Sequence, residues 1–343
     1  MSEKSKLMQL ESARGIAALI VVLYHFHSTS PLTANLFVLR SYPVDFFFVL
    51  SGFVIALNYG GMRTWAEAVA FIRRRFWRLY PLHLALLLAY VAFETLQWLI
   101  EQRTGQVGEV AAFTLNGPVA VIAHATLTQA ILLPDLTLNV PAWSISTEFW
   151  AYVIFALAVL IRHRALLVVG VISAAMVLVL DGGGLSATGA PGAIFRCLYS
   201  FMIGVGACAV FDKVRVPRAG WIAIGAFAVA TVLSIGGWAV MLIPFAFAAL
   251  VIALAKSSGG PLLWSPLTWI GTRSYSVYMV HFLAWQLATL ALRKIGLDPM
   301  QMPTWQSTLV VLAMVGVVLG VSALTYAWIE RPFMQRGARR LNA

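Results

Sequence analysis

Long apolar stretches recur along the whole chain, and short polar segments separate them. A helix needs about 20 apolar residues to cross the ~30 Å hydrocarbon core of a bilayer, and these stretches approach that length. We therefore predict an all-α polytopic bundle of about ten membrane spans, forming one domain over residues 1–343. The predicted spans are residues 12–28, 44–60, 80–100, 142–161, 165–181, 192–211, 218–236, 238–255, 270–291 and 307–329.

Two further segments are predicted to stay at the membrane surface. Residues 105–133 are apolar, but Asn116 and Pro118 interrupt them, which favours a re-entrant or interfacial segment over an eleventh span. Residues 66–79 combine arginines with an apolar side that includes Trp77, a pattern typical of an interfacial helix.

Composition excludes a soluble protein, because 61% of the residues are hydrophobic and 11% are charged, against about 25% charged in soluble domains. The net charge of +11 follows the topology, since short cytoplasmic loops collect Lys and Arg. With the N-terminus inside, the only Lys and Arg residues in the predicted outer segments are Arg40, Arg103, Arg293 and Lys294. This bias predicts both termini in the cytoplasm and removes the need for a nucleic-acid partner.

The first span carries two ionisable residues, Arg14 and His25. Ionisable groups within a membrane are expensive and generally face a protein-lined interior, so both are functional candidates. Eleven residues separate them, which places them on one helix face and ~16 Å apart along the axis. Arg14 could instead anchor the helix end by snorkelling, and His25 could be a buried histidine satisfied by its neighbours.

The fourth span begins with Trp143 and Ser144 and reaches Glu148 about one and a half turns later. Its predicted depth matches that of His25, so we expect the carboxylate to orient the imidazole and stabilise its protonated form. Such a pair suits a general base that removes a proton from an attacking hydroxyl. A purely structural pair between two helices is the alternative.

Other polar residues are candidates for binding substrates. Arg74, Arg75 and Arg78 precede the third span, where guanidinium groups suit phosphates but also suit membrane anchoring. The candidates for lining the substrate path are Asp45, Ser51, Trp143, Ser144, Tyr275, Tyr278 and His281, and polar contact between helices is their alternative role. We expect Asp45 at the outer surface, and Glu330-Arg331-Pro332 to end the last helix. No metal site is predicted.

The order of these motifs resembles the acyltransferase 3 family of membrane-bound O-acyltransferases. The resemblance rests on Glu11 to Ala18 with Tyr24-His25-Phe26, Asp45 to Phe53, Arg75 to Pro81, Trp143 to Glu148 with Tyr152, and Ser274 to His281. It covers essentially the whole chain. One departure is Thr147-Glu148-Phe149-Trp150, where apolar residues replace the polar ones that often follow the family glutamate.

The resemblance implies a ten-helix fold, a cytoplasmic acyl-CoA donor and an acceptor hydroxyl on a glycan or glycolipid outside. It also implies that Arg14 and His25 form an essential pair, and that Arg75 and Arg78 form an arginine motif. We expect CoA phosphates to bind Arg14, Arg74, Arg75 and Arg78, His25 to act as general base, and Tyr278 or Ser51 to stabilise the oxyanion.

The expected location is the bacterial inner membrane. Acyl-CoA, with acetyl-CoA as the expected donor, is a substrate rather than a bound cofactor. A proton-coupled transporter or flippase is the alternative, because buried Arg, His and Glu also serve transport. The chain shows no duplicated halves that favour it. The acceptor sugar, the acyl chain length, a covalent intermediate and the oligomeric state, including a homodimer, stay open.

Overall fold

The computed structural model describes residues 3–26, 29–30, 33, 42–107, 110–235, 237–257 and 259–339, and all regular elements in these ranges are helices. The first half contains α1 (Glu3–His25), α3 (Pro43–Tyr59), α4 (Trp65–Thr104), α5 (Pro118–Ala125), α6 (Gln129–Leu132), η1 (Val140–Ala142), α7 (Trp143–Ile161) and α8 (His163–Asp181). The second half contains α9 (Gly192–Phe211), α10 (Ala219–Leu233), η2 (Gly237–Leu242), α11 (Ile243–Lys256), η3 (Pro261–Leu263), α12 (Ser265–Thr272), α13 (Ser274–Lys294), η4 (Pro299–Gln301), α14 (Thr304–Thr325), η5 (Tyr326–Glu330) and α15 (Arg331–Arg339). The predicted all-α class is confirmed.

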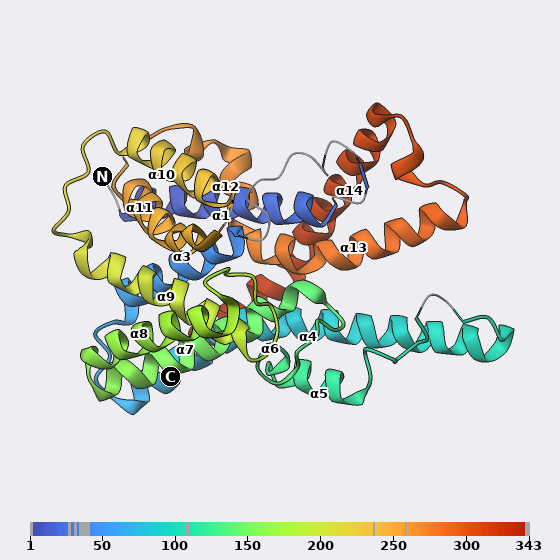
Figure 1. Cartoon of the computed structure of the whole chain (residues 1–343), viewed down its shortest axis with the longest axis horizontal. Helices are drawn as coiled ribbons and strands as arrows, with labels where there is room; N and C mark the ends of the chain where they lie inside the picture. The colour runs from blue at the N-terminus through green and yellow to red at the C-terminus, as the bar shows by residue number, and fades with distance from the viewer. Residues whose placement is uncertain are drawn as a thin grey trace.

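Seven helical segments within the described ranges are long and apolar enough to cross a membrane. They contain α4, α7, α8, α9, α11, α13 and α14. The other three predicted spans coincide with α1, α3 and α10, of which α3 and α10 are apolar but short, with 17 and 15 residues. Every predicted span therefore contains a helix, while crossing by α1, α3 and α10 stays a prediction. Figure 1 shows how these helices are arranged, while the compartment that either end of the chain faces also stays a prediction.

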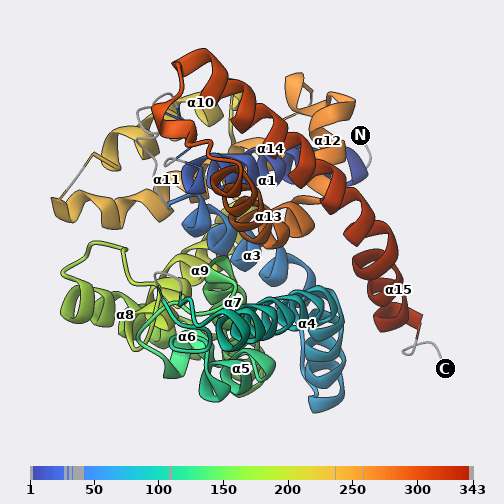
Figure 2. The ribbon, with the colours of Figure 1, turned by 90° about the vertical axis from the view of Figure 1, so that its right-hand side faces the viewer.

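Helix α4 joins two elements that the sequence pattern separates. The predicted interfacial helix over 66–79 and the third span form one helix of 40 residues, which contains Pro81. A proline inside a helix removes a hydrogen bond and bends the axis. The blue and teal parts of α4 run at a clear angle to each other in Figure 2. The prediction of two separate helices is wrong because the chain bends at this point without leaving the helix.

Segment 105–133 contributes only the short helices α5 and α6 among its described residues. Neither is long enough to cross a bilayer, which confirms that no eleventh span lies here. The segment packs on α7: the side chains of Ser146 and Trp150 donate hydrogen bonds to the Leu127 carbonyl, at 2.7 and 2.9 Å, and the Gln129 amide donates to the Ala142 carbonyl at 2.9 Å. The start of α7 is therefore covered by protein.

The last helix continues where the sequence pattern predicts its end. A π-helical turn, η5, connects α14 directly to α15, so that Glu330-Arg331-Pro332 lies inside a continuous helical segment. The wider π turn changes the register of the backbone hydrogen bonds just before Pro332, which has no N–H to donate.

Helix α1 packs against α3, α11, α12 and α13 (Figure 1). Helices α3 and α9 pack closely because glycines replace side chains where they cross. A Cβ atom on Gly52 would lie 2.0 Å from the Phe201 carbonyl oxygen, and one on Gly204 would lie 2.0 Å from that of Val49. This contact fixes α3, and thereby Asp45 and Ser51, against α9.

Candidate active site

Helix α1 presents Arg14 and His25 to different parts of the interior. The charges that act on Arg14 include those of Arg78 and Glu148, which come from α4 and α7. The Arg14 side chain makes no hydrogen bond to another residue within the described ranges of the chain. A cationic group with strong donors and no protein acceptor is suited to bind an anion.

His25 lies against His281 of α13. The ring centroids are 4.9 Å apart, and His25 Nδ1 lies 3.2 Å from His281 Nε2. The edge of the Phe282 ring also contacts His25, with centroids 5.6 Å apart. His281 is fully buried, whereas His25 is only partly buried. The structure therefore brings together two histidines that lie 256 residues apart in the chain.

The acceptors around these rings define where the protons lie. His281 Nδ1 is 2.6 Å from the Tyr278 carbonyl oxygen, which can only accept, so Nδ1 carries the proton and Nε2 the lone pair. His25 Nδ1 is 2.9 Å from the Val21 carbonyl oxygen and also faces that lone pair, so it donates. The basic nitrogen of neutral His25 is therefore Nε2.

Glu148 does not pair with His25. Its Oε1 accepts hydrogen bonds from Ser51 and from Tyr152, the latter at 2.5 Å, and it acts electrostatically on Arg14. The predicted depth assumed that α7 starts at the membrane surface. In the structure the start of α7 is covered by protein, and Glu148 lies within electrostatic range of Arg14. His281 takes the place beside His25 that the sequence pattern assigns to Glu148.

Arg74 and Arg75 lie over aromatic rings. Both guanidinium groups contact the Tyr59 ring, at 5.2 and 5.5 Å from its centroid, and Arg75 also contacts the rings of Phe71 and Tyr152. The Arg75 Nη2 donates to the Tyr59 hydroxyl at 3.4 Å. The buried Nε atoms of Arg74 and Arg75 have no hydrogen-bond partner in the part of the chain that the structure describes. Buried donors without acceptors are rare, and a phosphate would satisfy them.

Arg78 differs from these two, because its guanidinium pairs with the buried carboxylate of Glu330. Glu330 also accepts a 2.6 Å hydrogen bond from the Ser276 hydroxyl. Arg78 lies 5.7 Å from the centroid of the Tyr275 ring, whose hydroxyl donates to the Leu79 carbonyl at 2.5 Å. These contacts connect the first turn of α13 to α4 and to η5.

Asp45 lies in the first turn of α3 and is fully buried inside the protein, whereas its place at the outer end of the span stays a prediction. Its carboxylate accepts hydrogen bonds from Arg196 at 2.6 and 3.2 Å and from the Ser200 hydroxyl at 3.0 Å. Arg196, also fully buried, lies 5.2 Å from the centroid of the Trp143 ring. Sequence reasoning left Arg196 aside, although one unmatched arginine inside an apolar span signals a buried acidic partner.

The hydroxyl of Tyr278 is engaged within the protein. It donates to the Pro141 carbonyl at 3.0 Å and lies 2.9 Å from the Ser144 hydroxyl, which contacts the same carbonyl. Ser51 donates to Glu148. The hydroxyl groups of Tyr278 and Ser51, both predicted to stabilise an oxyanion, therefore have protein acceptors, and their observed contacts connect helices.

A second histidine pair, which sequence reasoning missed, lies between α4 and α5. His83 and His124 stack with centroids 5.8 Å apart, and His83 Nε2 donates to the His124 carbonyl at 2.9 Å. Burial, followed by the neighbouring His83, lowers the pKa of His124 to about 3. The His124 ring is therefore neutral at ordinary pH, which suits a packing role. The described residues contain no cluster of His, Cys, Asp and Glu that could hold a metal ion.

The sequence pattern of the family described as "Acyltransferase domain" matches residues 9–327, nearly the whole chain. The chain belongs to the acyltransferase 3 family. This membership makes the protein a membrane-bound acyltransferase, and it removes the support for a transporter as the alternative.

Curated relatives agree with the family. The chain is 27% identical over 303 residues to a protein of Komagataeibacter xylinus named as a membrane-bound transacylase, BcsY, covering 81% of this chain and 73% of that protein. It is 33% identical to "Protein 2 in picA locus" of Rhizobium radiobacter, over 45% of this chain and 83% of that protein. It is also 31% identical to the acyltransferase MdmB of Streptomyces mycarofaciens, over 44% and 39% of the two chains. No solved structure is significantly similar to the chain.

Proposed function

We propose that this acyltransferase moves an acyl group, acetyl in the simplest case, from cytoplasmic acyl-CoA to a hydroxyl of a glycan or glycolipid at the outer face of a bacterial inner membrane. The observation that carries the proposal is the arrangement along α1. Among the described residues, Arg14 on this helix has no hydrogen-bond acceptor, and His25, a histidine of defined tautomer, lies about 16 Å further along.

In the proposed reaction, His25 accepts the proton of the attacking hydroxyl. The acceptor oxygen attacks the thioester carbonyl carbon, and His25 Nε2 takes the proton of the hydroxyl as the new C–O bond forms. The C–S bond then breaks, and the same proton neutralises the departing CoA thiolate. The products are an ester and CoA with a free thiol, so the step balances without an oxidant or a further co-reactant.

His281 acts as a positioning residue in this scheme. Its Nε2 lone pair accepts from His25 Nδ1–H, which keeps the basic nitrogen of His25 at Nε2 and stabilises the imidazolium that forms when His25 takes the proton. The Tyr278 carbonyl holds His281 in the required tautomer. Glu148 contributes near Arg14 rather than near His25, and its negative charge orients the Arg14 guanidinium.

We assign the phosphates of the acyl-CoA donor to the arginines grouped near Arg14. Arg14, Arg74 and Arg75 offer guanidinium donors that the described residues leave without acceptors, and the aromatic rings under Arg74 and Arg75 fix their direction. Arg78 adds positive charge while its ion pair with Glu330 holds the cluster in place. The pantetheine arm of CoA is the part of the donor that spans from this cluster toward His25.

The activity is tested with purified protein in nanodiscs that contain a native bacterial lipid extract, together with acetyl-CoA and glycans from the source cells. Acyl transfer is read by the release of the free CoA thiol and by an acyl-sized mass increase on the glycan. We expect His25→Gln to lower kcat by a factor of about 10²–10⁴, the usual range for removal of a general base. A folded His25→Gln protein with normal turnover would refute the assignment.

Donor binding is tested by removing one arginine charge at a time. Arg75→Gln should raise the Kd of CoA, whereas Arg164→Gln is a matched control, because Arg164 is exposed in the first turn of α8. Each lost charge-assisted hydrogen bond contributes about 1.5–3 kcal/mol, or roughly a 10- to 100-fold change in Kd. Equal CoA affinities of the two variants would assign Arg75 to membrane anchoring.

A further inference from the structure

A large apolar cavity lies beside α1, on a helix face that carries neither Arg14 nor His25. It has a volume of about 550 Å³ and is bounded by α1, α3, α10, α11 and the segment that leads from α11 into η3. From α1, the lining residues are Gln9, Ala13, Ile16, Ala17 and Ile20, which recur at helical spacing. The cavity is therefore separate from the candidate active site.

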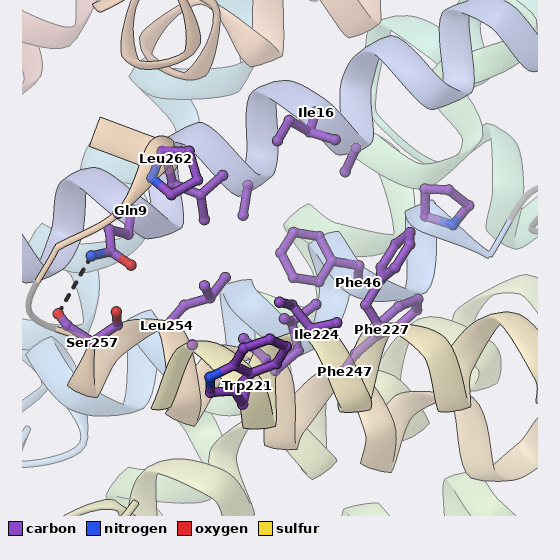
Figure 3. Close-up of a pocket in the computed structure, with 18 of the residues that line it drawn as sticks. Gln9, Ile16, Phe46, Trp221, Ile224, Phe227, Phe247, Leu254, Ser257 and Leu262 are labelled. Atoms are coloured by element: carbon purple, nitrogen blue, oxygen red, sulfur yellow. Dashed lines mark hydrogen bonds between the residues drawn. The ribbon is translucent and has the colours of Figure 1, made fainter. Parts of the chain in front are cut away.

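Polar groups are concentrated at one end of the cavity. Figure 3 shows Gln9 and Ser257 together at that end, and Phe46 and Phe227 toward the other. The Gln9 amide donates to the carbonyl oxygens of Ser257 and Gly259, at 3.4 and 3.2 Å. Between the two ends, the residues that line the cavity are apolar. Water does not fill such a cavity stably, because it would find too few hydrogen-bond partners.

The cavity opens at the surface of the protein along α10. Three of its lining residues, Trp221, Ile224 and Phe227, belong to α10 and are exposed by 73%, 61% and 42%. If α10 crosses the membrane as predicted, a molecule that enters between these side chains comes from the surrounding lipid. From Gln9 to Ile20 the cavity follows 11 residues of α1, or about 16 Å, which is close to half of the ~30 Å hydrocarbon core. Its length therefore matches one acyl chain of one leaflet.

Positive charge flanks the polar end. The loop between α9 and α10 ends two residues before Gly220, which lines the cavity. This loop contains three exposed basic residues, Lys213, Arg215 and Arg218, and one acidic residue, Asp212. A cluster of basic residues next to an apolar cavity complements a lipid phosphate above its hydrocarbon chain. We propose that the cavity binds one acyl chain of an anionic phospholipid, from the leaflet at the N-terminal end of α1, with its phosphate near this loop.

The proposal is tested by filling the cavity. Ala223 is buried, 6% exposed, and lines the cavity, whereas Ala228 is exposed on the same helix and does not line it. Delipidated protein is titrated in detergent with dioleoyl-phosphatidylglycerol, and bound lipid is counted by native mass spectrometry. We expect one lipid per chain at saturation for the wild type and for Ala228→Trp. For Ala223→Trp the affinity should fall by about tenfold or more, equivalent to about 1.4 kcal/mol.

Two further arms make the result independent of how well Ala223→Trp folds. Arg218→Gln should weaken phosphatidylglycerol binding and reduce its advantage over phosphatidylcholine, because the headgroup loses a cationic partner. Brominated phosphatidylglycerol should quench a fluorescence component that saturates at one lipid per chain and disappears in Trp221→Phe. The absence of saturable lipid binding to the wild type, equal affinities of Ala223→Trp and Ala228→Trp, or a lipid-free dimer with the cavity covered by a second copy would each overturn the proposal.

Discussion

Substitution of Gly204 by alanine tests whether the close contact between α3 and α9 holds the interior together. The added Cβ would lie 2.0 Å from the Val49 carbonyl oxygen, whereas ordinary contact begins at 3.4 Å, so the two helices must move apart by more than 1 Å. The Asp45–Arg196 ion pair connects the same two helices with a 2.6 Å hydrogen bond. A shift of this size along the bond would lengthen it to about 4 Å, beyond hydrogen-bonding distance.

The expected loss of stability follows from these two effects. Overpacking in a well-packed interior typically costs about 1–3 kcal/mol, and separation of a buried ion pair adds to that cost. We therefore expect Gly204→Ala to lower the free energy of unfolding by at least about 3 kcal/mol. Acyl transfer should fall as well, because α3 also carries Ser51, which donates to Glu148.

The measurement is thermal or denaturant-induced unfolding of the detergent-solubilised protein, together with thiol release from acetyl-CoA. Gly206→Ala is the matched control, because it lies on the exposed side of α9 and its added Cβ would meet no atom within 4 Å. Alanine is preferred over glycine in a helix by about 0.8–1.0 kcal/mol, so this control should be neutral or slightly more stable. If both glycine variants unfold alike and keep full activity, the close contact does not hold the interior.

Three further outcomes follow from the buried polar groups. Asp45→Asn should destabilise the protein by about 3–5 kcal/mol, because it leaves Arg196 buried without a counter-charge. The double variant Asp45→Asn with Arg196→Gln should lose less stability than the sum of the two single variants, and a loss equal to that sum would contradict the ion pair. His281→Ala should lower kcat and shift its pH profile while the KM for acetyl-CoA stays unchanged, since His281 contacts His25 and not the donor cluster; an unchanged pH profile would limit His281 to packing. Because the pKa of His124 is lowered from 6.5 to about 3, folding should be most stable above pH 6.5 and weaken as the pH falls toward 3, and His124→Gln should reduce this pH dependence of the unfolding temperature.

Local patterns in the sequence determine much of this protein. Apolar runs of span length define the helices, because a bilayer admits a polar backbone only when each segment satisfies its own hydrogen bonds. Each of the ten predicted spans coincides with a helix, and the ordered motifs around Arg14, His25 and Glu148 are sufficient to indicate the family. These properties depend on composition and on spacing within single segments, which the sequence displays directly.

Contacts between segments were decided by the tertiary structure. His25 contacts His281, whereas the carboxylate of Glu148 accepts hydrogen bonds from Ser51 and Tyr152, because the packing of α3 and α13 places those side chains there. The partner of Asp45 is Arg196, 151 residues away. A one-dimensional pattern gives the depth of a side chain only when its helix begins at the membrane surface, and it gives no information on which helices are neighbours. Relative depth and neighbourhood are set by packing of the whole chain, and these two quantities determine which ionisable groups meet.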